Sequence, residues 1–263
     1  MLKLIIKRTL TTLLALFTIQ VYALPSLQLG PSADGYSSTG WTYNDSPYED
    51  PSGLDTWIYD GGFNVGDTVT FSALANATKA DGGNGSYAWA SADTTRYGYL
   101  VLSAVPSTSG TNLFDVTVSN TTRMVKSGNG TPPPEDTNSL APHGVFDTWY
   151  QVWEFVFDGS VGTIHNTQPG DQGSDETGQG YLESFNLTLN SAADDLGGIH
   201  IDLFTLSGDG YYSDNLASGN KVVEAFAPFS HDATINVPEP GSLALMGLGL
   251  LGLGFNQRKR INK

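Results

Sequence analysis

Cysteine is absent from this sequence and basic residues are scarce, with 12 lysines and arginines against 27 aspartates and glutamates in 263 residues. Without cysteine the chain cannot form disulfides, so its stability must come from its core. Strong helix-forming residues are few, whereas glycine (31) and proline (13) are frequent and threonine, serine and asparagine are common. This composition favours an all-β domain with many loops.

The acidic charge is concentrated in the middle of the chain. Three basic residues lie before residue 9 and four lie after residue 257, so residues 24–237 hold five basic residues against 26 acidic ones, a net charge of −21. Such a surface repels nucleic acid and anionic lipid, which excludes DNA and RNA as partners. The same surface attracts divalent cations and favours solubility.

Residues 1–23 predict a signal helix that is removed after export. Three basic residues among the first eight precede an apolar run at residues 9–19, and we place the signal peptidase cut after Ala23. A retained membrane anchor is the alternative, but the apolar run is shorter than the ~20 residues that span a bilayer.

Residues 238–263 contain three parts in order. Pro238, Glu239 and Pro240 come first, an apolar run follows at residues 243–255, and a basic cluster comes last, formed by Arg258, Lys259 and Arg260. We expect the apolar run to form a short transmembrane helix with the basic cluster on the cytoplasmic side. The two prolines keep the first part extended and open to a protease. An ordinary single-span anchor with a proline-rich stalk is the alternative.

This order of parts resembles the PEP-CTERM sorting signal of bacterial surface proteins, which an exosortase recognises. The resemblance implies cleavage near Pro238, Glu239 and Pro240. It also implies transient anchoring in the inner membrane, followed by release or transfer to the surface. The expected source is a Gram-negative-type bacterium that makes an extracellular polysaccharide.

Period-two alternation of apolar and polar residues predicts half-buried antiparallel strands at residues 68–73, 114–119 and 185–190. Nearly continuous apolar runs predict strands that are covered on both faces, at residues 97–105, 151–157 and 199–206. Further strands are expected at residues 27–29, 56–59 and 221–226.

The strand count and the lack of a helical stripe before the tail predict an antiparallel β-sandwich over residues 24–237, of which a jelly roll is one form. Residues 127–144 and 162–180 are expected to be irregular. We interpret the first stretch as a surface loop, with a linker between two small domains as the alternative.

Catalytic signatures are missing: the sequence has no GxSxG, HExxH or phosphate-binding loop, so we expect a protein that is not an enzyme. The four histidines lack the spacing of metal ligands and are expected to be structural: His143, His165, His200 and His231. Glu154 with Glu183 is the carboxylate pair that a glycoside hydrolase would need, although nothing in the sequence brings them together.

Acidic loops are the best candidates for a bound ion. Asp171, Asp175 and Glu176 lie in one glycine-rich stretch, and calcium binds six to eight oxygens of this kind. The order of these residues does not follow a regular calcium-binding loop, so solvated acidic turns are the favoured interpretation. We expect no other cofactor.

Aromatic residues are plentiful and include Trp41, Tyr43, Trp57, Trp89, Trp149, Tyr150 and Trp153. We expect most of them to fill the core, with stacking on sugar rings as the alternative.

Three ordered patches resemble the choice-of-anchor N family of bacterial surface proteins: residues 24–29, 141–146 and 225–233. The resemblance implies a single exported domain with no assigned activity. We hypothesise that the patches containing His143 and His231 meet in space.

The resemblance of the tail, above all, implies an exported protein, displayed on or released from the cell surface and associated with extracellular polysaccharide or biofilm matrix. The predicted mechanism is shape and aromatic contact with glycan. An extracellular carbohydrate-active enzyme and a calcium-stabilised structural module are the alternatives.

Thermal melting of residues 24–237 with calcium or with excess chelator tests the acidic loops. Solvated turns gain nothing from calcium, so we expect the same melting temperature in both conditions. A calcium-dependent rise that Asp175→Asn abolishes would instead make the stretch around Asp171 a calcium site.

Overall fold

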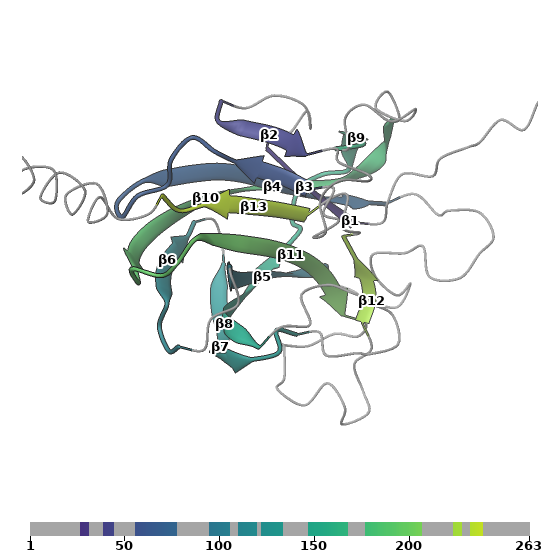
Figure 1. Ribbon diagram of the computed structural model, residues 1–263. Helices are drawn as coiled ribbons and strands as arrows, with labels where there is room; N and C mark the ends of the chain where they lie inside the picture. Colours follow the sequence, from purple (N-terminus) through teal and green to yellow (C-terminus); the bar gives the residue numbers. More distant parts are fainter. Residues whose placement is uncertain are drawn as a thin grey trace, which may run out of the picture.

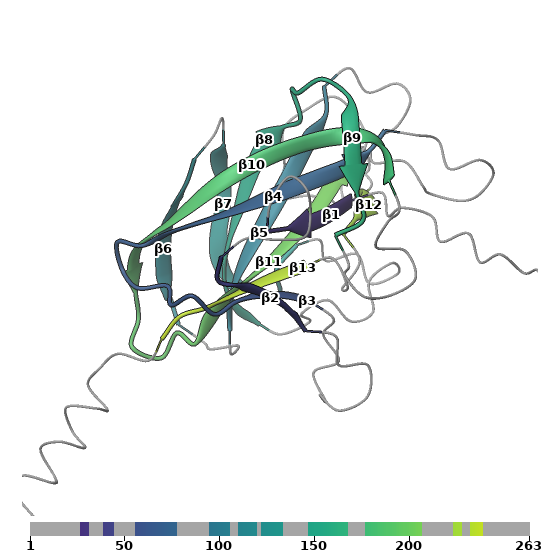
Figure 2. The same cartoon turned by 90° about the horizontal axis from the view of Figure 1, so that it is seen from above.

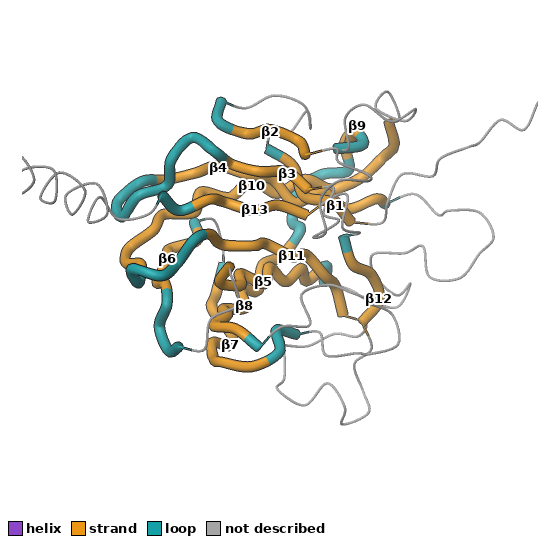
Figure 3. The backbone as a smooth tube through the Cα atoms, in the orientation of Figure 1, coloured by secondary structure: helices purple, strands orange, loops and turns teal. Residues whose placement is uncertain are grey.

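The computed structural model describes residues 27–31, 39–44, 56–77, 95–105, 110–119, 122–133, 147–167, 177–206, 223–227 and 232–238. Every regular element in these ranges is a strand (Figure 3), which confirms the all-β prediction. Within the same ranges no helix is long and apolar enough to cross a membrane. The predicted signal helix and transmembrane helix lie outside the described residues.

One sheet has five strands and is antiparallel throughout its described pairings. Its order is β1 (Leu27–Gly30), β4 (Thr68–Asn76), β10 (Thr177–Ala192) and β6 (Phe114–Val118), with β9 (Gly162–His165) also paired to β10. The 16-residue strand β10 organises this sheet, because β4, β6 and β9 all pair with it.

The other sheet has eight strands. Its order is β2 (Trp41–Asn44), β3 (Thr56–Tyr59), β13 (Asp232–Asn236), β11 (Gly198–Leu206), β5 (Tyr97–Val105), β8 (Thr148–Val156) and β7 (Arg123–Gly130), with β12 (Val223–Phe226) also paired to β11. Here β3 and β13 pair in parallel, so the prediction of wholly antiparallel sheets is wrong for this pair. The two strands are far apart in the sequence, so no hairpin imposes an antiparallel direction on them.

The two sheets share one hydrophobic core. Figure 1 shows β4 and β10 above β5, β8 and β7, and in Figure 2 β10 and β4 cross in front of those strands. Phe185 of β10 lies between the layers, with its ring centroid 5.4 Å from Phe71 of β4 and 4.8 Å from Phe155 of β8. All three rings are at most 2% exposed, so these contacts join the sheets in a dry interior.

The strands β5, β8 and β11 are buried on both faces, as their continuous apolar runs predict. Their inward side chains enter the shared core. Their outward side chains form a second apolar cluster of Tyr99, Val101, Tyr150, Val152, Phe204 and Leu206. The ring of Tyr99 stacks on Phe204 at 5.1 Å, which ties β5 to β11 on this outer side.

The sequence patterns located nine of the strands and missed β2, β7, β9 and β13. The prediction of irregular structure was wrong in part, because β7 continues to Gly130 and β9 and the start of β10 lie within residues 162–180. These segments gain backbone hydrogen bonds from a partner strand, which local polarity does not reveal. In both sheets, strands that precede residues 134–146 pair with strands that follow them: β4 and β6 pair with β10, and β5 pairs with β8 and β11.

Replacing Phe185 tests whether the inter-sheet contact dominates stability. We expect Phe185→Ala to lower the free energy of unfolding by about 3–5 kcal/mol, because it removes a buried ring and leaves a cavity. Val161→Ala is the matched surface control, since Val161 is 46% exposed and should change stability by less than about 0.5 kcal/mol. If the two variants lose the same free energy of unfolding in urea, the inter-sheet contact does not dominate stability.

Candidate functional site

The last strand that the structure describes, β13, is an inner strand of the eight-stranded sheet. β13 pairs with β3 on one side and with β11 on the other. Directly after it, Val237 is 9% exposed and its backbone N–H donates to the carbonyl oxygen of Gly197 at 2.9 Å. Pro238 is the next residue and is exposed. The chain is therefore held in the sheet up to Val237 and leaves its surface at Pro238.

The turn after β3 borders this exit. The Asn236 side-chain amide donates to the carboxylate of Asp60. Gly62, with φ of +80°, lies close enough that a Cβ there would be 4.0 Å from the ring of Pro238. The exit point is thus defined by two segments that are distant in sequence.

Most of the sequence-predicted site residues lie outside the described residues. Of the sorting motif, only Pro238 belongs to the described residues. The others lie outside them: Ala23, Asp171, Asp175, Glu176, Glu239, Pro240, Arg258, Lys259 and Arg260. His143 and His231, which were hypothesised to meet, also lie outside.

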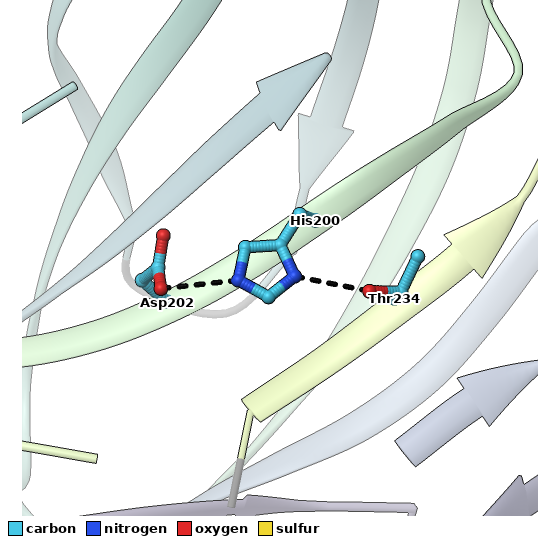
Figure 4. Close-up of polar contacts among 3 residues, drawn as sticks. All are labelled: His200, Asp202 and Thr234. Atoms are coloured by element: carbon cyan, nitrogen blue, oxygen red, sulfur yellow. Dashed lines mark hydrogen bonds and ion pairs between the residues drawn. The ribbon is translucent and has the colours of Figure 1, made fainter. Parts of the chain in front are cut away.

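A threonine, a histidine and an aspartate form a hydrogen-bonded series beside the exit (Figure 4). His200 of β11 has its Nδ1 atom 3.0 Å from the hydroxyl of Thr234 on β13 and its Nε2 atom 3.1 Å from the carboxylate of Asp202. The histidine and aspartate side chains are 13% and 21% exposed. The series was missed because no sequence pattern places residue 234 opposite residue 200.

The three residue types are those of a hydroxyl nucleophile, a base and an orienting carboxylate. Both ring nitrogens of His200 are already engaged, so the ring cannot bind a metal through either nitrogen without losing a bond. The bond to Thr234 crosses from β11 to β13. The series therefore fixes the last strand to its neighbour, and the expectation that His200 is structural agrees with this geometry.

Glu154, one of the two predicted carboxylates, is a buried charge with a dedicated partner. The carboxylate is 2.7 Å from the guanidinium of Arg123 on the neighbouring strand β7. Its neighbour Tyr99 is also buried, and burial raises the pKa of the Tyr99 phenol, which the Glu154 carboxylate raises further. Glu154 thus belongs to the outer side of the eight-stranded sheet.

Glu183, the other carboxylate, lies in the five-stranded sheet. It accepts hydrogen bonds from the backbone N–H groups of Asp158 at 3.1 Å and Gly159 at 3.3 Å. It therefore stabilises the turn that follows β8. The two glutamates thus lie in different sheets and hold different partners.

Most of the candidate aromatic residues fill the core, as predicted. Trp41, Trp57, Trp149 and Tyr150 are at most 8% exposed. Tyr43 and Trp153 are half-buried and pack against the core, and Trp89 lies outside the described residues. Within the described part of the chain, the large hydrophobic side chains that are exposed are Val65, Val105, Met124 and Val161, none of them aromatic.

Metal-ligating side chains do not gather in the part of the chain that the structure describes. No group of three histidine, aspartate or glutamate residues there is placed to hold an ion. The acidic stretch around Asp171 lies outside those ranges.

Comparison with known proteins identifies the tail. The PEP-CTERM protein-sorting motif matches residues 236–260, which begin at the last residue of β13. This match implies an exported surface protein that is transiently anchored in the membrane and processed by an exosortase. No curated protein sequence matches the chain.

Among solved structures, the chain is similar to AvmM, which catalyses macrocyclization in alchivemycin A biosynthesis. The sequences are 10% identical, and the alignment covers 76% of this chain and 96% of that chain with a TM-score of 0.33. Likeness at this level supports no conclusion about fold or function.

Removing the Thr234 hydroxyl tests the link between β13 and β11. We expect Thr234→Val to lower the free energy of unfolding by about 1 kcal/mol, because the side-chain shape is kept while one hydrogen bond is lost. Thr177→Val, on the exposed surface of β10, is the matched control and should have little effect. If the two variants unfold at the same urea concentration, the series does not stabilise the strand.

Proposed function

We propose that this chain is a non-enzymatic β-sandwich module that an exosortase delivers to the cell surface or the extracellular matrix. The observation that carries the proposal is the coincidence of two boundaries. The sorting motif begins at residue 236, and the folded chain leaves the sheet at Pro238. A domain built for release at this point needs all of its strands on the amino-terminal side of the cut.

The geometry of the exit supports this. A cut at or after Pro238 would keep β13 and the bond from Val237 to Gly197. A cut before residue 232 would remove a strand that pairs on both sides. Since Val237 is buried and Pro238 is exposed, a protease gains access only beyond the last stabilising contact.

The remaining steps follow from this route. Signal peptidase would cut after Ala23, and residues 243–255 would hold the chain in the inner membrane of a Gram-negative-type cell until the exosortase acts. The mature chain would then associate with extracellular polysaccharide in a biofilm. A net charge of −21 over residues 24–237 supports a soluble extracellular domain that avoids nucleic acid and anionic lipid.

The finer assignments belong to the same proposal. Two sheets that share one core support the β-sandwich, and a jelly-roll-like order is one form of it. Membership of the choice-of-anchor N family rests on the three sequence patches alone. A carbohydrate-active enzyme is the weaker alternative, since Glu154 and Glu183 hold separate partners. A calcium-stabilised module would depend on the acidic stretch around Asp171.

Substituting the motif in an exosortase-bearing bacterium tests the proposal. With Pro238→Ala, Glu239→Ala and Pro240→Ala combined, we expect the chain to stay in the membrane fraction with its C-terminal peptide intact by mass spectrometry. The unaltered chain should lose that peptide and reach the surface or the medium.

Pro132→Ala is the matched proline control and should be processed normally. The same host without its exosortase should retain every version of the chain. Processing of the triple variant, or processing without the exosortase, would overturn the proposed route.

A further inference from the structure

The outer face of the five-stranded sheet carries a patch of uncharged polar side chains. Its members, here called the threonine–asparagine face, are Thr68, Thr70, Thr117, Asn186, Thr188 and Asn190. Five of them are exposed and Thr188 is half-buried. On the same strands the alternate residues, such as Phe71 and Leu187, are buried in the core, so the face points away from it.

Strand register aligns these side chains in rows. Thr68 of β4 lies opposite Thr188 of β10, which in turn lies opposite Thr117 of β6. Thr70 lies opposite Asn186 in the next row. Neighbouring strands lie about 4.8 Å apart, and side chains on the same face of one strand follow one another at about 6.8 Å. The face is therefore a regular array of hydroxyl and amide groups.

Hydrogen bonds between the strands hold this array in place. The hydroxyls of Thr68 and Thr188 are 2.7 Å apart, and the Thr70 hydroxyl donates to the Asn186 amide oxygen at 2.7 Å. The Asn190 amide donates to the Thr117 hydroxyl at 3.0 Å. Each hydroxyl and amide has a capacity for more than one hydrogen bond. The side chains are thus ordered in advance, which lowers the entropy cost of binding a ligand.

The charge of this face contrasts with the rest of the chain. Residues 24–237 hold 26 acidic residues, yet among the exposed side chains that the structure describes on β4, β6 and β10 only Asp115 is charged. Asp115 also accepts a hydrogen bond from Asn190 at 3.1 Å. An acidic polymer would be repelled by the net charge of −21, whereas a neutral polymer would not.

We propose that the threonine–asparagine face binds a neutral extracellular polysaccharide through hydrogen bonds to its hydroxyl groups. This inference rests on the proposed association with polysaccharide and names both the face and the class of ligand. Each hydrogen bond to a sugar hydroxyl contributes little by itself. An extended polymer engages several rows together and binds far more tightly than a monosaccharide does.

Affinity electrophoresis of the processed protein tests the inference. The probes are hydroxyethyl cellulose and dextran as neutral polymers, alginate as an acidic polymer, and free glucose as a competitor. We expect a neutral polymer to retard the protein, alginate not to retard it, and glucose to compete only weakly. Thr70→Ala combined with Asn186→Ala should weaken the retardation at least tenfold.

One further variant serves as a control, and another is a second test of the face. Asn129→Ala changes an exposed residue on β7 of the other sheet and should bind as the unaltered chain does. Asn190→Ala is a milder change to the face, so a loss of binding there remains informative if the double variant unfolds. Melting curves establish that each variant is folded.

The outcomes separate this inference from the proposed function. If folded face variants are still retarded, the threonine–asparagine face is not the binding surface, but the association with polysaccharide stands. Retardation by alginate alone would overturn the choice of a neutral ligand. If no polymer retards a protein that is correctly processed, the binding proposals fail and the sorting route stands.

Discussion

Everything in this structure depends on the dry contact between the two sheets, because a chain without cysteine has no covalent means of holding them together. The Phe71, Phe185 and Phe155 rings carry that contact from β4 through β10 to β8. Their burial leaves the outward sides of the sheets free to differ. One sheet carries a second apolar cluster on its outward side, and the other presents an ordered polar array there. The outward side of the five-stranded sheet is therefore not needed for packing the two sheets together.

The strands with a strong hydrophobic pattern could be predicted from the sequence. β5 was located to the residue, because a nearly continuous apolar run of nine residues is typical of a strand that is buried on both faces. β7 could not, since Gly128, Asn129 and Gly130 suggest a turn and only pairing with β8 makes them a strand. The direction of β3 against β13 also lies beyond local patterns, because both partners are short and widely separated.

The candidate sites show a similar division. The sorting motif is local and could be recognised from Pro238 onward, whereas its relation to the last strand required the fold. The alternation of Thr68 and Thr70 with apolar residues revealed a solvent-facing side but not its rows, which depend on register with β10. Aromatic recognition of glycans was the expected mechanism. Burial of Trp41, Trp57 and Trp149 removes their rings from contact with a ligand at the surface.

The position of β13 also sets the order in which the molecule can assemble. β2 and β3 join the rest of their sheet through β13, which is the last strand in the described part of the chain. Export and synthesis both proceed from the amino terminus, so the described strand pairing that joins β2 and β3 to the rest of their sheet cannot form until residue 236 has emerged. The last pairing of this sheet therefore forms at the end of the chain that carries the sorting motif. A cut beyond Pro238 leaves every described strand on the amino-terminal side.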